Sequence, residues 1–184
     1  IGNAALGGSI AGGEYNIAIG NGSLDSLTSG DNNTALGYQA GTGITTGGNN
    51  VIIGEEAGIT LTAGSDNVAI GQEALKNEND HGKNVAIGRQ TLFTQDAGAD
   101  AYNIAVGYQA GAALTTGVKN IAIGGLALDT ADTGTQNTAI GHEAGTALTS
   151  GADNTILGFN SAKTLTTASF NTILGADACD TGTM

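Results

Sequence analysis

"NTAIGHEAGTALTSGAD" occupies residues 137–153, and the chain then begins the same phrase again with "NTILG" at 154–158. The opening Asn recurs every 17 residues, apart from one spacing of 13 and one of 19. The copies begin at Asn3, Asn16, Asn33, Asn50, Asn67, Asn84, Asn103, Asn120, Asn137, Asn154 and Asn171. A period this regular is typical of a solenoid, so we expect one repeat domain over residues 1–184. Because the chain begins inside a repeat, we expect a segment of a longer protein.

The first half of each repeat has the pattern of a short β-strand. With Asn counted as position 1, position 4 is always Ile, Leu or Val and position 5 is always Gly. The second half, as in "ALTTG" at 113–117, again ends in Gly and predicts a second short strand. Two strands and two turns make one flat coil. The sequence therefore predicts an all-β fold, a parallel β-solenoid or β-roll of about ten 17-residue coils stacked about 4.8 Å apart.

Two recurring residue types indicate how the coils turn and stack. Gly at position 5, and frequently at position 15, predicts reversals with positive φ. Asn tolerates left-handed backbone, and its amide can pass hydrogen bonds from coil to coil as a structural turn ladder. We expect this ladder to run through Asn16, Asn33, Asn50, Asn67, Asn84, Asn103, Asn120, Asn137, Asn154 and Asn171.

Positions 9 and 12 of the repeat vary together. Where position 9 is Gly, as at Gly111, position 12 is large and apolar, as at Leu114. Where position 9 is Leu, as at Leu75, position 12 is polar or small, as at Glu78. Protein cores hold nearly constant volume, so one large side chain from either position should fill each coil. The coil that begins at Asn16 departs from this rule, because it has Leu at both positions.

The first strand is apolar on both faces. Side chains alternate along a strand, so positions 2 and 4 face one way and position 3 faces the other. One face packs inside the coil, and the other forms an apolar stripe along the whole rod, which soluble monomers rarely expose. We expect copies of the chain to cover it in a cyclic assembly, with Val68, Ile70, Val85 and Ile87 packed around the symmetry axis.

The repeats resemble those of two known families. "DNVAIG" at 66–71, "KNVAIG" at 83–88 and "QNTAIG" at 136–141 resemble the head repeats of trimeric autotransporter adhesins. The longer phrase "NTALGYQAGTGITTGGN" at 33–49 is similar to repeats of phage and bacterial tail-fibre-type proteins. The resemblance implies a left-handed parallel β-roll assembled as a parallel homotrimer.

Composition argues against several other functions. The net charge is −12 with only five Lys plus Arg, so there is no electrostatic basis for binding nucleic acid. No apolar run approaches the roughly 18 residues of a membrane span. His81 and His142 lie four coils apart, about 19 Å, which allows no nucleophile and base pairing. We therefore expect a protein that is not an enzyme and that needs no cofactor.

Acidic residues form one candidate cation site. Stacking should place Glu56 beside Glu73 in the next coil, with Glu55 and Asp66 near them. Like charges this close should raise a carboxylate pKa or recruit a cation such as calcium. The alternative is a solvated acidic edge without an ion.

The one long repeat, at residues 84–102, is a second candidate site. It carries two extra residues and Phe93, and Arg89, Tyr102 and Tyr108 fall on neighbouring edge positions. Aromatic faces with one charged donor suit a sugar ring. The alternative is a surface insertion that costs little stability and binds nothing.

Two functions follow from this reading of the repeats. The first is the shaft or head of a trimeric attachment protein, extracellular on a virion tail or cell surface, with a cell-surface glycan or protein as receptor. The second is a structural spacer or filament subunit without a ligand. A binder should break its repeat where it meets the ligand, whereas a spacer can stay uniform.

Overall fold

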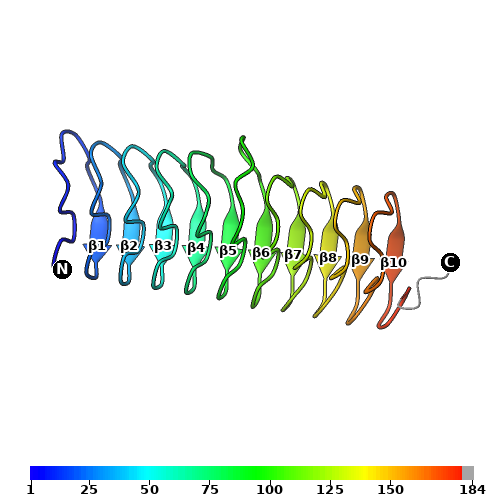
Figure 1. The fold of residues 1–184 in the computed structure, drawn as a ribbon. Helices are drawn as coiled ribbons and strands as arrows, with labels where there is room; N and C mark the ends of the chain where they lie inside the picture. Colours follow the sequence, from blue (N-terminus) through cyan, green and yellow to red (C-terminus); the bar gives the residue numbers. More distant parts are fainter. Residues whose placement is uncertain (180–184) are drawn as a thin grey trace.

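The computed structural model describes residues 1–179 as a row of stacked coils, and from Asn16 onward each coil holds one three-residue strand (Figure 1). The strands are β1 (Ile17–Ile19), β2 (Thr34–Leu36), β3 (Val51–Ile53), β4 (Val68–Ile70), β5 (Val85–Ile87), β6 (Ile104–Val106), β7 (Ile121–Ile123), β8 (Thr138–Ile140), β9 (Thr155–Leu157) and β10 (Thr172–Leu174). Residues 1–179 contain no helix that could span a membrane. Residues 180–184, the end of the predicted domain, lie outside the described part.

The strands form one parallel sheet in chain order, which confirms the predicted all-β, parallel β-solenoid. Each strand pairs with the equivalent residues one repeat later, as Val68 does with Val85 and Ile70 with Ile87. The register holds across the long repeat too, where Val85 pairs with Ile104. The two extra residues therefore leave the sheet undisturbed, and Figure 1 shows a narrow projection in the loop between β5 and β6.

The predicted second strand of each coil is wrong. In the described coils this half consists of turns and bends. The backbone N–H groups of Thr45, Thr46 and Gly47 all converge on one carbonyl oxygen, that of Thr62, at 2.9, 3.3 and 3.3 Å. Three consecutive donors can reach one acceptor only if the chain curves sharply, whereas an extended strand would spread them over several acceptors. This half still joins neighbouring coils, but without strand geometry.

The prediction for Gly is correct at position 5 and wrong at position 15. Gly71, at position 5, has φ +135°, a conformation that side chains disfavour. Gly47, at position 15, does not have positive φ. It is required for a different reason, because a Cβ there would lie 2.2 Å from the carbonyl oxygen of Gly64 in the next coil. Close stacking, not backbone handedness, selects Gly at position 15.

The Asn side chains form a buried ladder through the row. The Asn137 backbone N–H donates to Asn120 Oδ1 at 2.9 Å, and Asn137 Nδ2 donates to the Gly151 carbonyl at 2.8 Å. The same pattern recurs from coil to coil. The expectation that Asn itself adopts left-handed backbone is wrong, because the positive φ belongs to the residue before it, as at Gln136 with φ 57°. Asn is needed here for its amide.

The core lies inside the coils and consists mainly of Ala, Leu and Ile. Position 3 of the repeat, the middle residue of each strand, points into it, as at Ala69. The space left by Gly at position 9 is real: a Cβ at Gly41 would lie 2.9 Å from Ile44 Cδ1 and 3.1 Å from Leu24 Cδ2. Gly41 therefore makes room for Leu24 of the preceding coil. This explains how that coil buries both Leu24 and Leu27.

Candidate functional site

The apolar stripe expected from the sequence lies on the outside of the sheet. Val68 and Ile70 are half-buried on either side of the buried Ala69, and in the next coil Val85 is half-buried and Ile87 exposed on either side of the buried Ala86. The register stacks these residues directly on one another. Outward positions stay apolar or Thr from β1 to β10. The described rod thus carries a continuous ridge of branched side chains that no other part of residues 1–179 covers.

The predicted acidic cation site is organised around a lysine. Lys76 Nζ lies 2.8 Å from Glu56 Oε2 and 2.6 Å from Glu73 Oε1, so an ammonium group joins the two stacked carboxylates. The expectation of a raised pKa is wrong for Glu73, because the hydrogen bond from Lys76, with another from Gln90, holds the pKa of Glu73 below its ordinary value. Lys76 supplies the positive charge at this position.

The other two members of the acidic set are placed differently. Glu55 Oε2 accepts a hydrogen bond from Gln72 Nε2 at 3.1 Å on the exposed edge. Asp66 precedes Asn67, at the opposite end of strand β4 from Glu73. Asp66 is therefore separated from the glutamates by the length of the strand.

The predicted sugar-binding residues form three separate pairs, each between a cation and an aromatic ring of the next coil. Arg89 Cζ lies 6.0 Å from the centroid of the Tyr108 ring. Phe93 lies beside Lys76 instead, with Nζ 5.6 Å from its centroid. Tyr102 lies beside Lys83, with Nζ 5.2 Å from its centroid.

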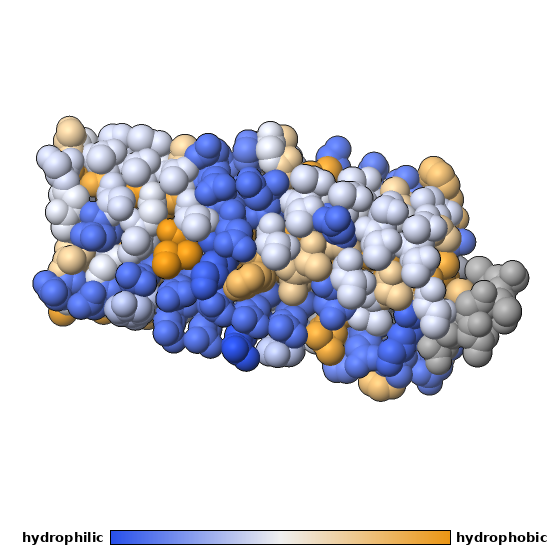
Figure 2. Space-filling view, viewed as in Figure 1, coloured by the Kyte–Doolittle hydropathy of each residue, from blue (hydrophilic) through white to orange (hydrophobic). Residues whose placement is uncertain are grey.

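The four residues are thus distributed along the coil edge. Tyr102 precedes strand β6 and Tyr108 follows it, so the two rings lie at opposite ends of one strand. Only Arg89 and Tyr108 pair with each other. Figure 2 shows hydrophilic side chains gathered over the middle of the row, around β5, where three of the five Lys and Arg residues of the chain occur.

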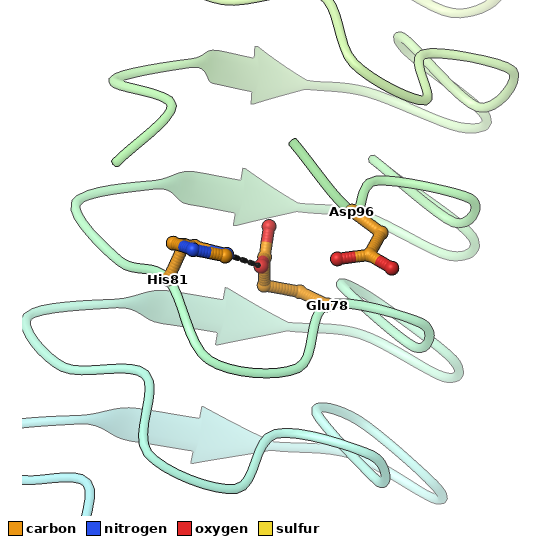
Figure 3. Close-up of side chains that lie close together, drawn as sticks. All are labelled: Glu78, His81 and Asp96. Atoms are coloured by element: carbon orange, nitrogen blue, oxygen red, sulfur yellow. Dashed lines mark ion pairs between the residues drawn. The ribbon is translucent and has the colours of Figure 1, made fainter. Parts of the chain in front are cut away.

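A group of titratable residues that the sequence reading did not combine lies in the same two coils. Glu78, His81 and Asp96 each offer a ligand atom, and these atoms all lie within 4.8 Å of one another. His81 Nδ1 lies 3.5 Å from Glu78 Oε1. In Figure 3 the Glu78 carboxylate sits between the His81 ring and the Asp96 carboxylate. Two residues come from one coil and the third from the next.

These residues occupy positions where the repeat departs from its pattern. Glu78 stands at position 12, which holds Leu61 in the preceding coil, and His81 stands at position 15, which is usually Gly. In the next coil the long loop projects outward, and Gly98 in this loop has no atom within 4 Å of a Cβ position, unlike the closely stacked Gly47. The sequence could have revealed this cluster, because Glu78 and His81 both depart from the repeat and the next coil carries the two extra residues.

The Glu78 carboxylate is in an unfavourable environment. Its side chain is fully buried, and neither carboxylate oxygen has a hydrogen-bond partner. Burial raises the pKa of Glu78, and the His81 ring and the nearby backbone N–H groups of His81 and Asn79 oppose that rise only in part. The buried Nδ1 of His81 also lacks a hydrogen-bond partner. By contrast Gln95, the equivalent residue one coil later, is satisfied by Thr115 and Asn103.

No family model, curated protein or solved structure matches this chain. Three features of the described residues bear on function: the outward apolar stripe, the cation–aromatic pairs of the irregular coil, and the cluster of Glu78, His81 and Asp96 beside it.

Proposed function

We propose that this chain is a segment of a homotrimeric attachment fibre, in which three parallel copies pack their apolar stripes around a common axis. The observation that carries the proposal is the stripe. Ile17 and Ile104, both at position 2 of the repeat, are 54% and 38% exposed, and Ile123, at the outward position 4, is 37% exposed. Patches this continuous mark interaction surfaces in soluble proteins.

A second copy of the same chain is the partner that suits this stripe best. The ridge repeats with the coil spacing over all ten strands, so a partner with the same repeat can contact it along its whole length. Cyclic symmetry satisfies this requirement and closes the assembly, whereas other arrangements leave one ridge open. A left-handed trimer is the form that the resemblance to adhesin and tail-fibre repeats implies.

The shape of the described part suits extension from a particle or cell. Every coil is tied to the next by backbone hydrogen bonds, and the chain contains no Pro to interrupt them. The acidic charge of −12 disfavours nucleic acid as a partner. We infer an extracellular, non-enzymatic role on a virion tail or cell surface.

Sedimentation equilibrium tests the assembly. The unmodified chain should sediment as three copies, and replacing Ile70 and Ile87 together by Asp should release monomers or abolish folding, because a trimer core would bury unpaired carboxylates. Replacing Glu55 and Gln72, both exposed, by Ala is the matched control and should leave the trimer intact. A stable monomer of the unmodified chain would contradict the proposal.

We further propose that this segment itself binds a receptor. The alternative is a spacer that binds no ligand. Arg89 and Tyr108 are its best candidates, because they combine an exposed ring with a charged donor. On a glycan array, Tyr108→Ala should weaken binding of any sugar that the unmodified trimer retains. Tyr38→Ala is the control. Tyr38 holds the same position in its repeat as Tyr108, but the equivalent position of the preceding coil holds Asn21 and not Arg. Equal loss in both variants, or no retained sugar, favours the spacer.

A further inference from the structure

We propose that Glu78, His81 and Asp96 bind one divalent transition-metal ion, with Zn²⁺ as the best fit, and that the ion ties the coil of Asn67 to the coil of Asn84. The three ligand atoms already lie within 4.8 Å of one another. Ligands of a tetrahedral zinc ion lie about 2.0–2.2 Å from the metal, so small side-chain rotations would close the site.

The strongest support is the buried carboxylate of Glu78. An ionised carboxylate inside a core costs several kcal/mol unless a charge or hydrogen bonds compensate it. Glu78 is fully buried and neither oxygen has a hydrogen-bond partner. Both carboxylates together would balance the charge of one divalent ion. The equivalent side chains Leu61 and Leu114 show what the repeat uses where no ligand is required.

The imidazole supplies the second argument. His81 replaces the Gly that close stacking otherwise favours at position 15, and its Nδ1 is buried, unpartnered and directed at Glu78 (Figure 3). A neutral imidazole nitrogen is a common zinc ligand. A salt bridge with protonated His81 would be the simpler use of the pair, but at 3.5 Å the contact is longer than a hydrogen bond.

Asp96 completes the set from the next coil and leaves the site open to solvent. It is exposed, and Asn79 Nδ2 donates to its Oδ2 at 3.3 Å, which helps to orient it. Outer hydrogen bonds of this kind position metal ligands. Three protein ligands leave a fourth position for water. Calcium fits less well, because it prefers six to eight oxygen ligands.

The ion would reinforce the rod where its regular contacts fail. Among the ladder residues from Asn16 to Asn171, Asn84 is the one whose Nδ2 has no acceptor. The two extra residues of the same coil interrupt the close stacking at position 15. A metal held by Glu78 and His81 on one side and Asp96 on the other would bridge this interruption.

Calorimetry and thermal unfolding of the tag-free chain, first stripped with a chelator, test the proposal. Titration should show one Zn²⁺ per chain, and a 100-fold excess over the dissociation constant should raise the unfolding temperature by about 5–10 °C. Co²⁺ in place of Zn²⁺ should give the visible absorption of a site with nitrogen and oxygen ligands. Absence of both responses, or a response to Ca²⁺ alone, overturns the proposal.

Variants then locate the site. His81→Gly restores the usual residue of the repeat and should fold, but it should lose the Zn²⁺ response, as should Asp96→Asn. His142→Ala is the matched control, because it removes the other histidine, which stacks on Phe159 far along the row. A Zn²⁺ response that persists in His81→Gly, or that disappears equally in His142→Ala, places the metal elsewhere.

Glu78→Leu distinguishes the effect of metal binding on stability from the effect of the buried carboxylate itself. It inserts the side chain that other coils carry at position 12, so in chelator it should unfold at a higher temperature than the unmodified chain. In Zn²⁺ the order should reverse, because only the unmodified chain binds the ion. If Glu78→Leu binds Zn²⁺ with unchanged affinity, the proposal is wrong.

Discussion

A Cβ placed on Gly88 would lie 2.4 Å from the carbonyl oxygen of Gly107 in the next coil. The same relationship recurs at position 5 along the row, so the spacing between coils is set by backbone touching backbone at these glycines. Their φ, +132° at both residues, is also one that only Gly adopts readily. Gly at this position thus serves both the turn and the stacking.

Gly88→Ala should therefore destabilise the fold by at least about 3 kcal/mol, since it combines a strained φ with a clash against rigid backbone. Chemical denaturation measures the change. Gly12→Ala is the control, because its Cβ would find its nearest neighbour, Ser29 Cβ, at 4.0 Å. Similar denaturation curves for the two variants would show that the coils can move apart at little cost.

The Asn ladder makes a second prediction. Asn120→Ala removes the acceptor of the Asn137 N–H and the donor to the Gly134 carbonyl, at 2.9 and 2.8 Å. Both groups are left without a partner inside the rod, and each buried orphan costs about 1–3 kcal/mol, so we expect a loss of about 2–6 kcal/mol.

Hydrogen exchange distinguishes this effect from general loosening. The Asn137 amide should exchange faster in Asn120→Ala, while amides several coils away keep their protection, since each coil contacts only its neighbours. Asn21→Ala is the control, because Asn21 is exposed and outside the ladder. Unchanged protection of Asn137 would show that water replaces the lost amide.

Substitutions at positions 9 and 12 of one coil should compensate for each other. A Cβ on Gly111 would lie 2.9 Å from Leu114 Cδ1, so Gly111→Leu alone overfills the coil and should cost about 1–3 kcal/mol. Leu114→Ala alone leaves a cavity and should cost about 2–5 kcal/mol. The double variant reproduces the arrangement of Leu128 and Ala131 in the next coil. Its loss of stability should be smaller than the sum, with a coupling of about 0.5–3 kcal/mol. Strict additivity, measured by denaturation, would contradict a shared space.

The fold could be predicted from sequence because one observation, the recurring Asn-to-Gly phrase, constrains every coil at once. Val68 must pair with Val85 if equivalent residues stack, and they do. What the pattern could not give was backbone detail. A run such as Thr45 and Thr46 reads as a strand, but its N–H groups converge on one acceptor. Likewise, left-handed backbone belongs to Gln136 and not to Asn137.

The candidate sites were harder to predict, because they depend on how side chains reach across coils. Stacking correctly places Glu56 beside Glu73, but the repeat does not reveal that Lys76 extends between them. The cluster of Glu78, His81 and Asp96 escaped notice because Asp96 belongs to the next coil. Its members become visible in the sequence only as departures from the repeat.

The lysine between Glu56 and Glu73 leads to a prediction about pH. The pKa of Glu73 is lowered in the folded protein, chiefly by its hydrogen bond from Lys76. A lowered pKa adds stability above the ordinary value of 4.5, and that stability is lost as pH falls through the lower folded value. In Lys76→Met the Glu73 carboxylate loses the lysine but keeps the hydrogen bond from Gln90 Nε2. The unmodified chain should thus lose more stability than Lys76→Met between about pH 6 and pH 3. The difference should stay within about 1 kcal/mol, because the pair is only partly buried.

Lys119→Met is the control, since it removes an exposed lysine from another coil. Unfolding temperatures measured across this range should show a shallower acid dependence for Lys76→Met than for Lys119→Met. Identical profiles for these two variants would mean that the Glu73 carboxylate gains nothing from Lys76 that the general loss of a positive charge does not explain.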